Sequence, residues 1–321
     1  ATGPLRNGLD ELLAVVRAET FDRPASPQTI QHLWPLSSCR EERCPRVIAV
    51  DLPSGLDADS GAIDLRALPA DVTVTFAHPK RGHLAYPGAD YVGDLLVADI
   101  GIPVDLAPGD APNVASADSV AVMLPPRPSS GHKGTYGSVM VLGGSTNYVG
   151  APCLAARAAY RVGAGLVTLA LPAAIHDVAA SLLPEATHLL LPHSLGALNY
   201  DALDVIGSEL PRYQVLLAGP GLGRDPATRE LLAGLLGGDN SAHRVIGFAP
   251  HKAPELRLAL PPLILDADGL NLLADLPDWP SRLPPGTILT PHPGEMARLT
   301  GKKVGHINAA RLASAMEAAE A

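Results

Sequence analysis

Polar residues suited to catalysis or ligand binding follow two short apolar runs near the C-terminus, at residues 263–265 and 286–290. Such runs are typical of buried parallel strands, and the ligands of open α/β sheets bind just beyond the carboxyl ends of such strands. The two runs therefore predict two walls of one site. The alternative is that the same side chains form turns and helix caps, which also favour Asp, Thr and Asn. The residues concerned are Asp266, Asp268, Asn271, His292 and Glu295.

Length and composition limit the classes of protein to consider. The chain has 321 residues, a length that predicts about two domains. Its net charge of −9 and the lack of a basic cluster argue against a nucleic-acid partner. No apolar run is long enough to span a membrane. The three cysteines, Cys39, Cys44 and Cys153, offer no disulfide framework, which predicts a reducing, cytoplasmic location.

The first half of the chain predicts buried strands, one of which ends in a carboxylate. Residues 9–18 have the apolar spacing of an amphipathic helix, and residues 19–46, rich in Pro, Ser and Arg, predict a loop. Asp51 falls at the carboxyl end of a predicted buried strand, where parallel sheets expose catalytic groups. The basic loop at 78–82 is interpreted as a solvated turn rather than a phosphate contact. The predicted strands are 47–51, 70–76 and 95–100.

Glycine-rich turns organise the second half, which follows a proline-rich stretch at 103–131. The turn at 143–147 joins a strand to a helix and could offer backbone N–H groups to an anion, although its spacing matches neither a dinucleotide fingerprint nor a phosphate-binding loop. The turn at 219–223 requires a ligand or another backbone to approach closely. We predict domains at 1–108 and 131–321 with a linker at 109–130. Further predictions are strands at 138–142, 165–171, 188–191 and 214–218, helices at 151–162, 226–236 and 308–320, and a surface insertion at 237–261.

Several of these motifs resemble those of two enzyme families. The first half is similar to the C-terminal half of NAD(P)H-hydrate epimerase through VDLPSGLD, GADY and DIGI, which begin at 50, 88 and 99. The second half is similar to ADP-dependent NAD(P)H-hydrate dehydratase through HKGTYG, GAP, GAG, GPGLG, DADGLN and PHPGE, which begin at 132, 150, 163, 219, 266 and 291. The two families occur fused in this order in bifunctional nicotinamide-nucleotide repair enzymes. The likeness covers nearly the whole chain outside 19–46 and 237–261.

The resemblance implies a fold and a reaction. The implied fold is the C-terminal part of a Rossmann-like epimerase domain, followed by a ribokinase-like α/β domain that lacks its C-terminal part. The epimerase interconverts the R and S hydrates of NADH and NADPH. The dehydratase uses ADP, or ATP in some relatives, with Mg²⁺, and returns the S hydrate to NAD(P)H with release of AMP and phosphate. A potassium ion and a homo-oligomer are also implied.

The resemblance also implies residue roles. Asp51 matches the epimerase's Asp and could act as general acid or base if partly desolvated, and Ser54 matches a potassium contact. Thr2 and Gly3 match the tail of a substrate-binding glycine loop. The dehydratase's substrate contacts match Ala151, either Gly221 or Gly223, and His292.

We expect His292 and the turn at 219–223 to face one pocket and to contact the hydrated nucleotide. His292 lacks Cys, His or carboxylate partners at metal-ligand spacing, apart from Glu295, so a metal site is not predicted. The alternative is a histidine that caps a helix and binds no ligand.

Motifs of both families are missing at the two ends of the chain. The epimerase's early Asn-Asn-Gly-Gly-Asp-Gly motif and the dehydratase's late Gly-Thr-Gly-Asp motif are absent. We therefore expect a fragment truncated at both ends, inactive in both halves as it stands. Two other functions stay open. One is a ribokinase-like small-molecule kinase for a vitamin precursor, which leaves the Asp51 domain unexplained. The other is a non-catalytic nucleotide-binding scaffold.

Overall fold

The computed structural model describes residues 46–103, 106, 111–237 and 258–321. The chain divides into two compact units, Ala1–Val122 and Met123–Ala321, with a boundary inside the predicted linker at 109–130. The predicted helix at 9–18 and the predicted contacts Thr2 and Gly3 lie outside the described residues.

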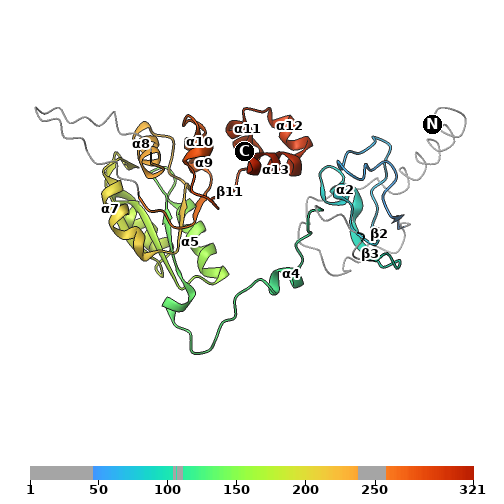
Figure 1. Ribbon diagram of the computed structural model, residues 1–321, viewed down its shortest axis with the longest axis horizontal. Helices are drawn as coiled ribbons and strands as arrows, with labels where there is room; N and C mark the ends of the chain where they lie inside the picture. The colour runs from blue at the N-terminus through green and yellow to red at the C-terminus, as the bar shows by residue number, and fades with distance from the viewer. Residues whose placement is uncertain (1–45, 104–105, 107–110, 238–257) are drawn as a thin grey trace, which may run out of the picture. The chain divides into compact units, whose positions relative to one another are not determined.

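The first unit contains a three-stranded parallel sheet with the order β1-β2-β3 (Figure 1). Val50 of β1 pairs with Val74 of β2, which pairs with Leu96 of β3. The prediction that the first strand is buried is wrong, because Ile48 and Val50 are 63% and 67% exposed. Alternate residues of a strand share a face, so these two side chains lie on one exposed side. The elements are β1 (Ile48–Val50), β2 (Val72–Phe76), β3 (Asp94–Ala98), α2 (Arg81–Leu84), α3 (Ala89–Val92) and α4 (Ala117–Ala121).

The second unit is built on a six-stranded, all-parallel sheet with the order β11-β10-β9-β4-β5-β6. From β4 the chain adds β5 and β6 on one side, and then crosses to place β9, β10 and β11 on the other. The strand order therefore reverses between β4 and β9, which is the switch point where open α/β sheets bind ligands. The strands are β4 (Ser138–Leu142), β5 (Leu166–Pro172), β6 (Thr187–Leu191), β9 (Val215–Ala218), β10 (Leu263–Leu265) and β11 (Ile288–Leu289).

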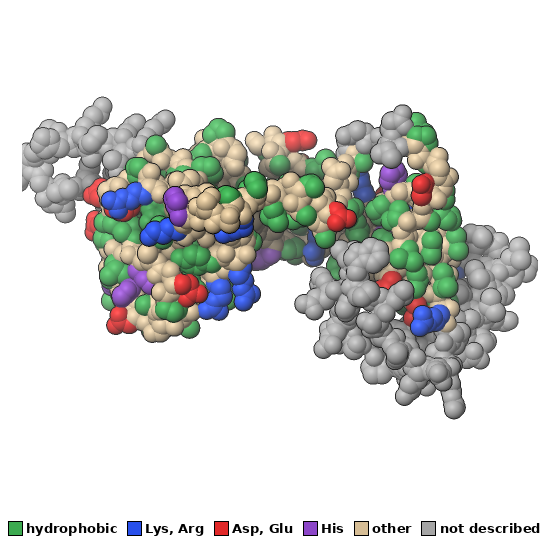
Figure 2. All heavy atoms as spheres, turned by 90° about the horizontal axis from the view of Figure 1, so that it is seen from below, with side chains coloured by type: hydrophobic (Ala, Val, Ile, Leu, Met, Phe, Trp, Pro, Cys, Tyr) green, Lys and Arg blue, Asp and Glu red, His purple; other side chains and the backbone are tan. Residues whose placement is uncertain are grey.

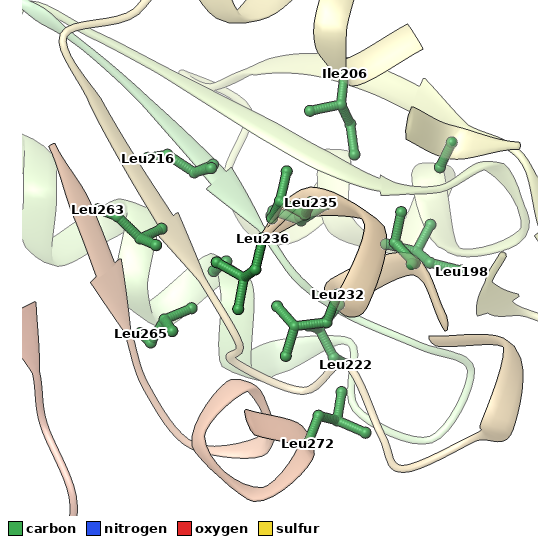
Figure 3. Packing of buried hydrophobic residues seen from close by; sticks show 14 of the residues in the cluster. Leu198, Ile206, Leu216, Leu222, Leu232, Leu235, Leu236, Leu263, Leu265 and Leu272 are labelled. Carbon is green, nitrogen blue, oxygen red and sulfur yellow. The ribbon is translucent and has the colours of Figure 1, made fainter. Parts of the chain in front are cut away.

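Helices cover both faces of this sheet, because alternate strand residues point to opposite sides. Val141 of β4 packs with Ala156 of α5 on one face, whereas Met140 packs on the other face in the cluster that holds Ile206 of α7 and Leu232 of α8. In Figure 3, leucines from β9, β10, α8 and α9 converge in this second cluster. The helices are α5 (Gly150–Val162) and α6 (His176–Leu182) on one face, and α7 (Ala202–Glu209), α8 (Pro226–Leu235) and α9 (Asp268–Ala274) on the other.

The C-terminal helices differ from the prediction. Instead of one helix at 308–320, α12 (Val304–Ala309) and α13 (Arg311–Glu320) are separated at Ala310, whose φ of −144° and ψ of 52° are not helical. Helix α11 (Pro293–Thr300) packs against α9 and α12. The other elements are η2 (Lys133–Tyr136), η3 (Ala173–Ile175), η4 (Leu210–Arg212), the antiparallel pair β7 (His193–Ser194) and β8 (Ala197–Leu198), and α10 (Trp279–Arg282).

Acidic, basic and apolar side chains are mixed on the face of the second unit shown in Figure 2. Within the described ranges, no helix has the length and apolar character needed to cross a membrane.

Candidate functional site

Two glycine-containing turns meet at the switch point of the second unit. Gly144, after β4, donates its N–H to Pro220 O, after β9, at 2.9 Å. At Gly143 a Cβ would lie only 2.4 Å from Pro220 O, so no side chain fits between the two turns. The close approach predicted for the turn at 219–223, here called the glycine turn, is therefore confirmed.

The glycine turn also touches the start of α5. A Cβ at Gly221 would lie 3.2 Å from Ala151 Cβ and 2.7 Å from Tyr148 O, and the φ of Gly221 is +69°. The structure thus brings two predicted substrate contacts, Ala151 and Gly221, side by side.

Asp268 ties the glycine turn to the next strand end. Gly223 donates its N–H to Asp268 Oδ2 at 3.0 Å, and Asn271 Nδ2 donates to Asp268 Oδ1 at 3.4 Å. The residue before it, Ala267, has a φ of 51°, an uncommon backbone conformation for a residue with a side chain. Strain of this kind is often found at functional sites. Asp268 and Asn271, two of the predicted polar residues, therefore lie beside the glycine turn, and the two walls of one site stay a prediction.

Helix α5 begins beside the glycine turn and can offer backbone N–H groups to a ligand there. It begins without a side-chain cap and without an acidic residue in its first turn, so its N–H groups and positive helix end suit an anion. Nearby, Ser145 is 6% exposed, and its Oγ has no hydrogen-bond partner among the described residues. Sequence reasoning included Ser145 in a glycine-rich turn but did not single out its hydroxyl.

His292 lies beyond β11 on the same edge of the sheet. Thr290 Oγ1 donates to Asp266 Oδ1 at 2.8 Å, which links the ends of β11 and β10. His292 caps α11, because its Nδ1 accepts the N–H of Gly294 at 3.0 Å, and Glu295 Oε2 accepts the N–H of His292 at 2.9 Å. His292 therefore does cap a helix, as the alternative interpretation of this residue predicted. Strand β10 lies between β11 and β9, so the ends of these two strands are about 10 Å apart. The pocket that His292 and the glycine turn are expected to share stays a prediction.

A separate surface hollow of about 570 Å³ contains none of the predicted site residues. It is lined by Leu235 and Leu236 at the end of α8, by Leu258 and Leu260, and by residues of 278–284 such as Arg282. We favour the strand ends over this hollow, because the predicted site residues and the unpartnered hydroxyl of Ser145 lie at the strand ends.

In the first unit, Asp51 is held by three donors on a single oxygen. Its Oδ1 accepts from Thr75 Oγ1 at 2.9 Å and Phe76 N at 3.2 Å, and pairs with Lys80 Nζ. The Lys80 hydrogen bond, only partly opposed by desolvation, holds the pKa of Asp51 below its ordinary value. The sequence analysis expected desolvation to control the pKa of Asp51. The hydrogen bond from Lys80 has the larger effect on this pKa. The φ of Asp51 is 65°, another uncommon conformation.

Lys80 is the residue that sequence reasoning missed. Its ammonium also donates to Thr75 Oγ1 at 2.7 Å and to Phe76 O at 3.2 Å. The interpretation of 78–82 as a solvated turn is wrong for Lys80, whose side chain is 28% exposed and pairs with the carboxylate of Asp51. The buried His83 contacts Asp51 O through Nε2 at 2.9 Å, and burial lowers the pKa of its imidazole.

Few side chains in the described residues could bind the Mg²⁺ and potassium ions that the resemblance implies. The described residues include no cluster of three or more His, Cys, Asp and Glu side chains able to hold a metal ion. Mg²⁺ bound to nucleotide phosphates needs only one or two carboxylates, and Asp266 and Asp268 stand at the expected edge. Ser54 is exposed, and within the described part no such cluster accompanies it. Ser54 offers one hydroxyl oxygen to the predicted potassium ion, and this ion stays a prediction.

A doubly wound parallel sheet with a glycine turn at its switch point defines an α/β domain that binds a small ligand at the carboxyl edge of the sheet. The chain belongs to the NAD(P)H-hydrate dehydratase family, whose sequence model matches residues 139–321. A second model, described as YjeF-related protein N-terminus, matches residues 23–82. The resemblance to the repair families and the α/β fold class are thereby confirmed.

Similar proteins carry names that fit both family models. The chain is 43% identical over 272 residues to a bifunctional NAD(P)H-hydrate repair enzyme of Moorella thermoacetica, covering 83% of this chain and 47% of that protein. It is 36% identical over 274 residues to one of Thermofilum pendens, covering 85% and 48%. The chain therefore spans about half the length of the curated relatives it matches. A solved Bacillus subtilis ADP/ATP-dependent NAD(P)H-hydrate dehydratase, co-crystallised with ATP and Mg²⁺, is 28% identical, with a TM-score of 0.45 and coverage of 63% and 61%.

Proposed function

We propose that the chain carries substrate-binding parts of a nicotinamide-nucleotide repair enzyme. The second unit binds the S hydrate of NADH or NADPH for ADP-dependent (or ATP-dependent) dehydration, and the first unit takes part in epimerisation of the R and S hydrates. The observation that carries the proposal is the convergence of Ala151, Gly221 and Asp268 at the switch point of a domain that belongs to the dehydratase family.

The strand ends suit an anionic nucleotide. The uncapped start of α5 offers donors to phosphate oxygens. In the glycine turn, the N–H groups of Gly219, Leu222 and Gly223 already donate within the protein. Asp268 holds Gly223 in place and so keeps the turn open toward the ligand. Mg²⁺ would be held by the nucleotide's phosphates with Asp266 or Asp268, and would neutralise phosphate charge. A homo-oligomer stays part of the proposal.

In the first unit, we infer that Asp51 acts as the base. A carboxyl whose pKa is lowered is ionised at neutral pH and accepts a proton before it can donate one. Lys80, Thr75 and Phe76 occupy Oδ1, which leaves Oδ2 to face the substrate. Potassium at Ser54 stays a prediction.

Calorimetric titration tests the dehydratase half. Wild-type chain is titrated with the S hydrate of NADPH, with NADPH and with ADP. We expect the hydrate to bind, and Ala151→Leu, which pushes a larger side chain into the glycine turn, to weaken binding by tenfold or more. Ala158→Leu, on the exposed face of the same helix, is the matched control and should bind like wild type. Absence of hydrate binding to the folded wild-type chain would refute the proposal.

A further inference from the structure

The buried side chain of His83 makes a hydrogen bond through each nitrogen of its ring. Nδ1 accepts the backbone N–H of Lys80 at 3.1 Å, and Nε2 contacts the backbone oxygen of Asp51 at 2.9 Å. A nitrogen that accepts an N–H carries no proton, and a carbonyl oxygen only accepts, so the neutral ring carries its proton on Nε2 and donates it to Asp51 O. The ring thus joins the main chains of the two residues whose side chains form the carboxylate–ammonium pair.

The ring of His83 is neutral at neutral pH. Burial is the largest cause that lowers its pKa from the ordinary value of 6.5, and the ammonium of Lys80 acts in the same direction. The hydrogen bond to Asp51 O and the carboxylate of Asp51 oppose this change, but the pKa remains lowered. A buried neutral ring with both nitrogens engaged is suited to holding the backbone in place rather than to moving a proton.

The backbone that His83 holds is a strained turn centred on Asp51. The φ of Asp51 is 65°, and Leu52 donates its N–H to Val50 O at 2.9 Å, which closes a turn of three residues. Turns of this size with a positive φ are rare and strained, and such strain persists only where surrounding contacts hold it. Val74 O accepts the N–H of Asp51 at 2.8 Å, and His83 donates to the carbonyl oxygen of Asp51. The two contacts fix the peptide groups on both sides of the carbon that bears the carboxylate.

A close approach at Gly82 places His83 for this contact. Gly82 donates its N–H to Ala58 O at 2.6 Å, and a Cβ at Gly82 would lie 2.1 Å from Asp57 O. A side chain does not fit there, so α2 packs directly on the backbone at 57–58. The position of His83, the next residue along the chain, is fixed by this packing.

We propose that His83 is a positioning residue for Asp51, and that its Nε2–H holds the strained turn in the conformation that directs the carboxylate toward Thr75 and Lys80. This inference rests on the proposed function, which makes Asp51 the base. Without the contact the turn relaxes and the carboxylate moves away from its donors. A displacement of about 1 Å in a catalytic group can cost about 10²-fold in rate, which is why the base needs such a support.

Two amide substitutions separate the roles of the two nitrogens. The amide of Asn reaches about as far as Nδ1, so His83→Asn keeps an acceptor for the N–H of Lys80 and loses the donor to Asp51 O. The longer side chain in His83→Gln brings an NH₂ donor near the position of Nε2. Both variants lose the ring, so a difference between them reports on the contact with Asp51 rather than on lost packing. His78→Asn, at an exposed histidine in the loop before α2, is the matched control.

NMR spectroscopy of the whole chain measures the position of Asp51 in two ways. We expect ¹³C titration to give a higher pKa of Asp51 in His83→Asn than in wild type, because the displaced carboxylate loses the hydrogen bond from Lys80 that lowers this pKa. A positive φ brings Hα close to the amide proton of the same residue, so the strong NOE between these protons of Asp51 should also be lost in His83→Asn. His83→Gln and His78→Asn should keep the pKa and the NOE of wild type.

The nitrogen chemical shifts of the wild-type imidazole add a test that needs no substitution. We expect the proton of the His83 ring on Nε2, and a proton on Nδ1 would overturn the inference even if His83→Asn failed to fold. An unchanged pKa and NOE of Asp51 in folded His83→Asn, or the same loss in His83→Gln, would also overturn it. Calorimetric titration of the wild-type chain with the R hydrate of NADPH tests the role of the first unit separately. Absence of binding there would refute that part of the proposed function and leave the NMR result on His83 standing.

Discussion

Gly219→Ala tests whether the ends of β9 and β10 are packed as tightly as the structure indicates. Gly219 has a φ of +133°, and a Cβ there would lie 1.8 Å from Asp266 O. The backbone strain costs about 1–3 kcal/mol, and the displacement needed to relieve the overlap costs about 1–3 kcal/mol more. The expected loss in the free energy of unfolding is therefore about 2–6 kcal/mol.

Gly301→Ala is the matched control, because Gly301 has a φ of +69° and a Cβ there would meet nothing within 4 Å. Strain alone predicts a loss of about 1–2 kcal/mol at this position. Urea unfolding followed by Trp279 fluorescence in a Trp34→Phe background reports on the second unit, since Trp279 packs against its core. Equal losses for the two variants would show that the strand ends are not closely packed, and would refute the reasoning.

Three further predictions follow from single contacts. Lys80→Met should raise the pKa of Asp51, as measured by ¹³C NMR titration. Because folding lowers this pKa, the ionised Asp51 stabilises the folded chain above the ordinary pKa of 3.8. This stability is lost as the pH falls through the folded pKa. An unchanged pKa would exclude Lys80 as its cause. Asp268→Ala, which removes the acceptor for Gly223, should weaken hydrate binding about tenfold, whereas Asp268→Asn should have a smaller effect; equal affinities would count against the contact. Burial raises the pKa of the Cys153 thiol, so iodoacetamide should label it far more slowly in the native chain than in urea, and equal rates would contradict that burial.

The sequence predicted elements best where the signal is local. The apolar run at 138–142 lies between glycines and matches β4 residue for residue. The helix cap given as the alternative for His292 is also local, and α11 begins at the next residue. The break at Ala310 was missed, because residues 308–320 contain neither Gly nor Pro.

Contacts between distant residues could not be predicted in this way. Lys80 lies 29 positions from Asp51, and Asp268 lies 45 positions from Gly223. These pairs meet only because parallel pairing places β1 beside β2 and β9 beside β10. The sequence identified Asp51 and Asp268 as strand-end carboxylates. It carried no signal for Lys80, which lowers the pKa of Asp51, or for the contact of Asp268 with Gly223.

A crystal structure of the chain with hydrated NADPH tests the central claim most directly. The account predicts ligand density at the carboxyl edge of the six-stranded sheet, in contact with Ala151 and the glycine turn. Ligand density in the hollow lined by Leu235 and Leu260 instead, with the strand ends empty, would contradict it.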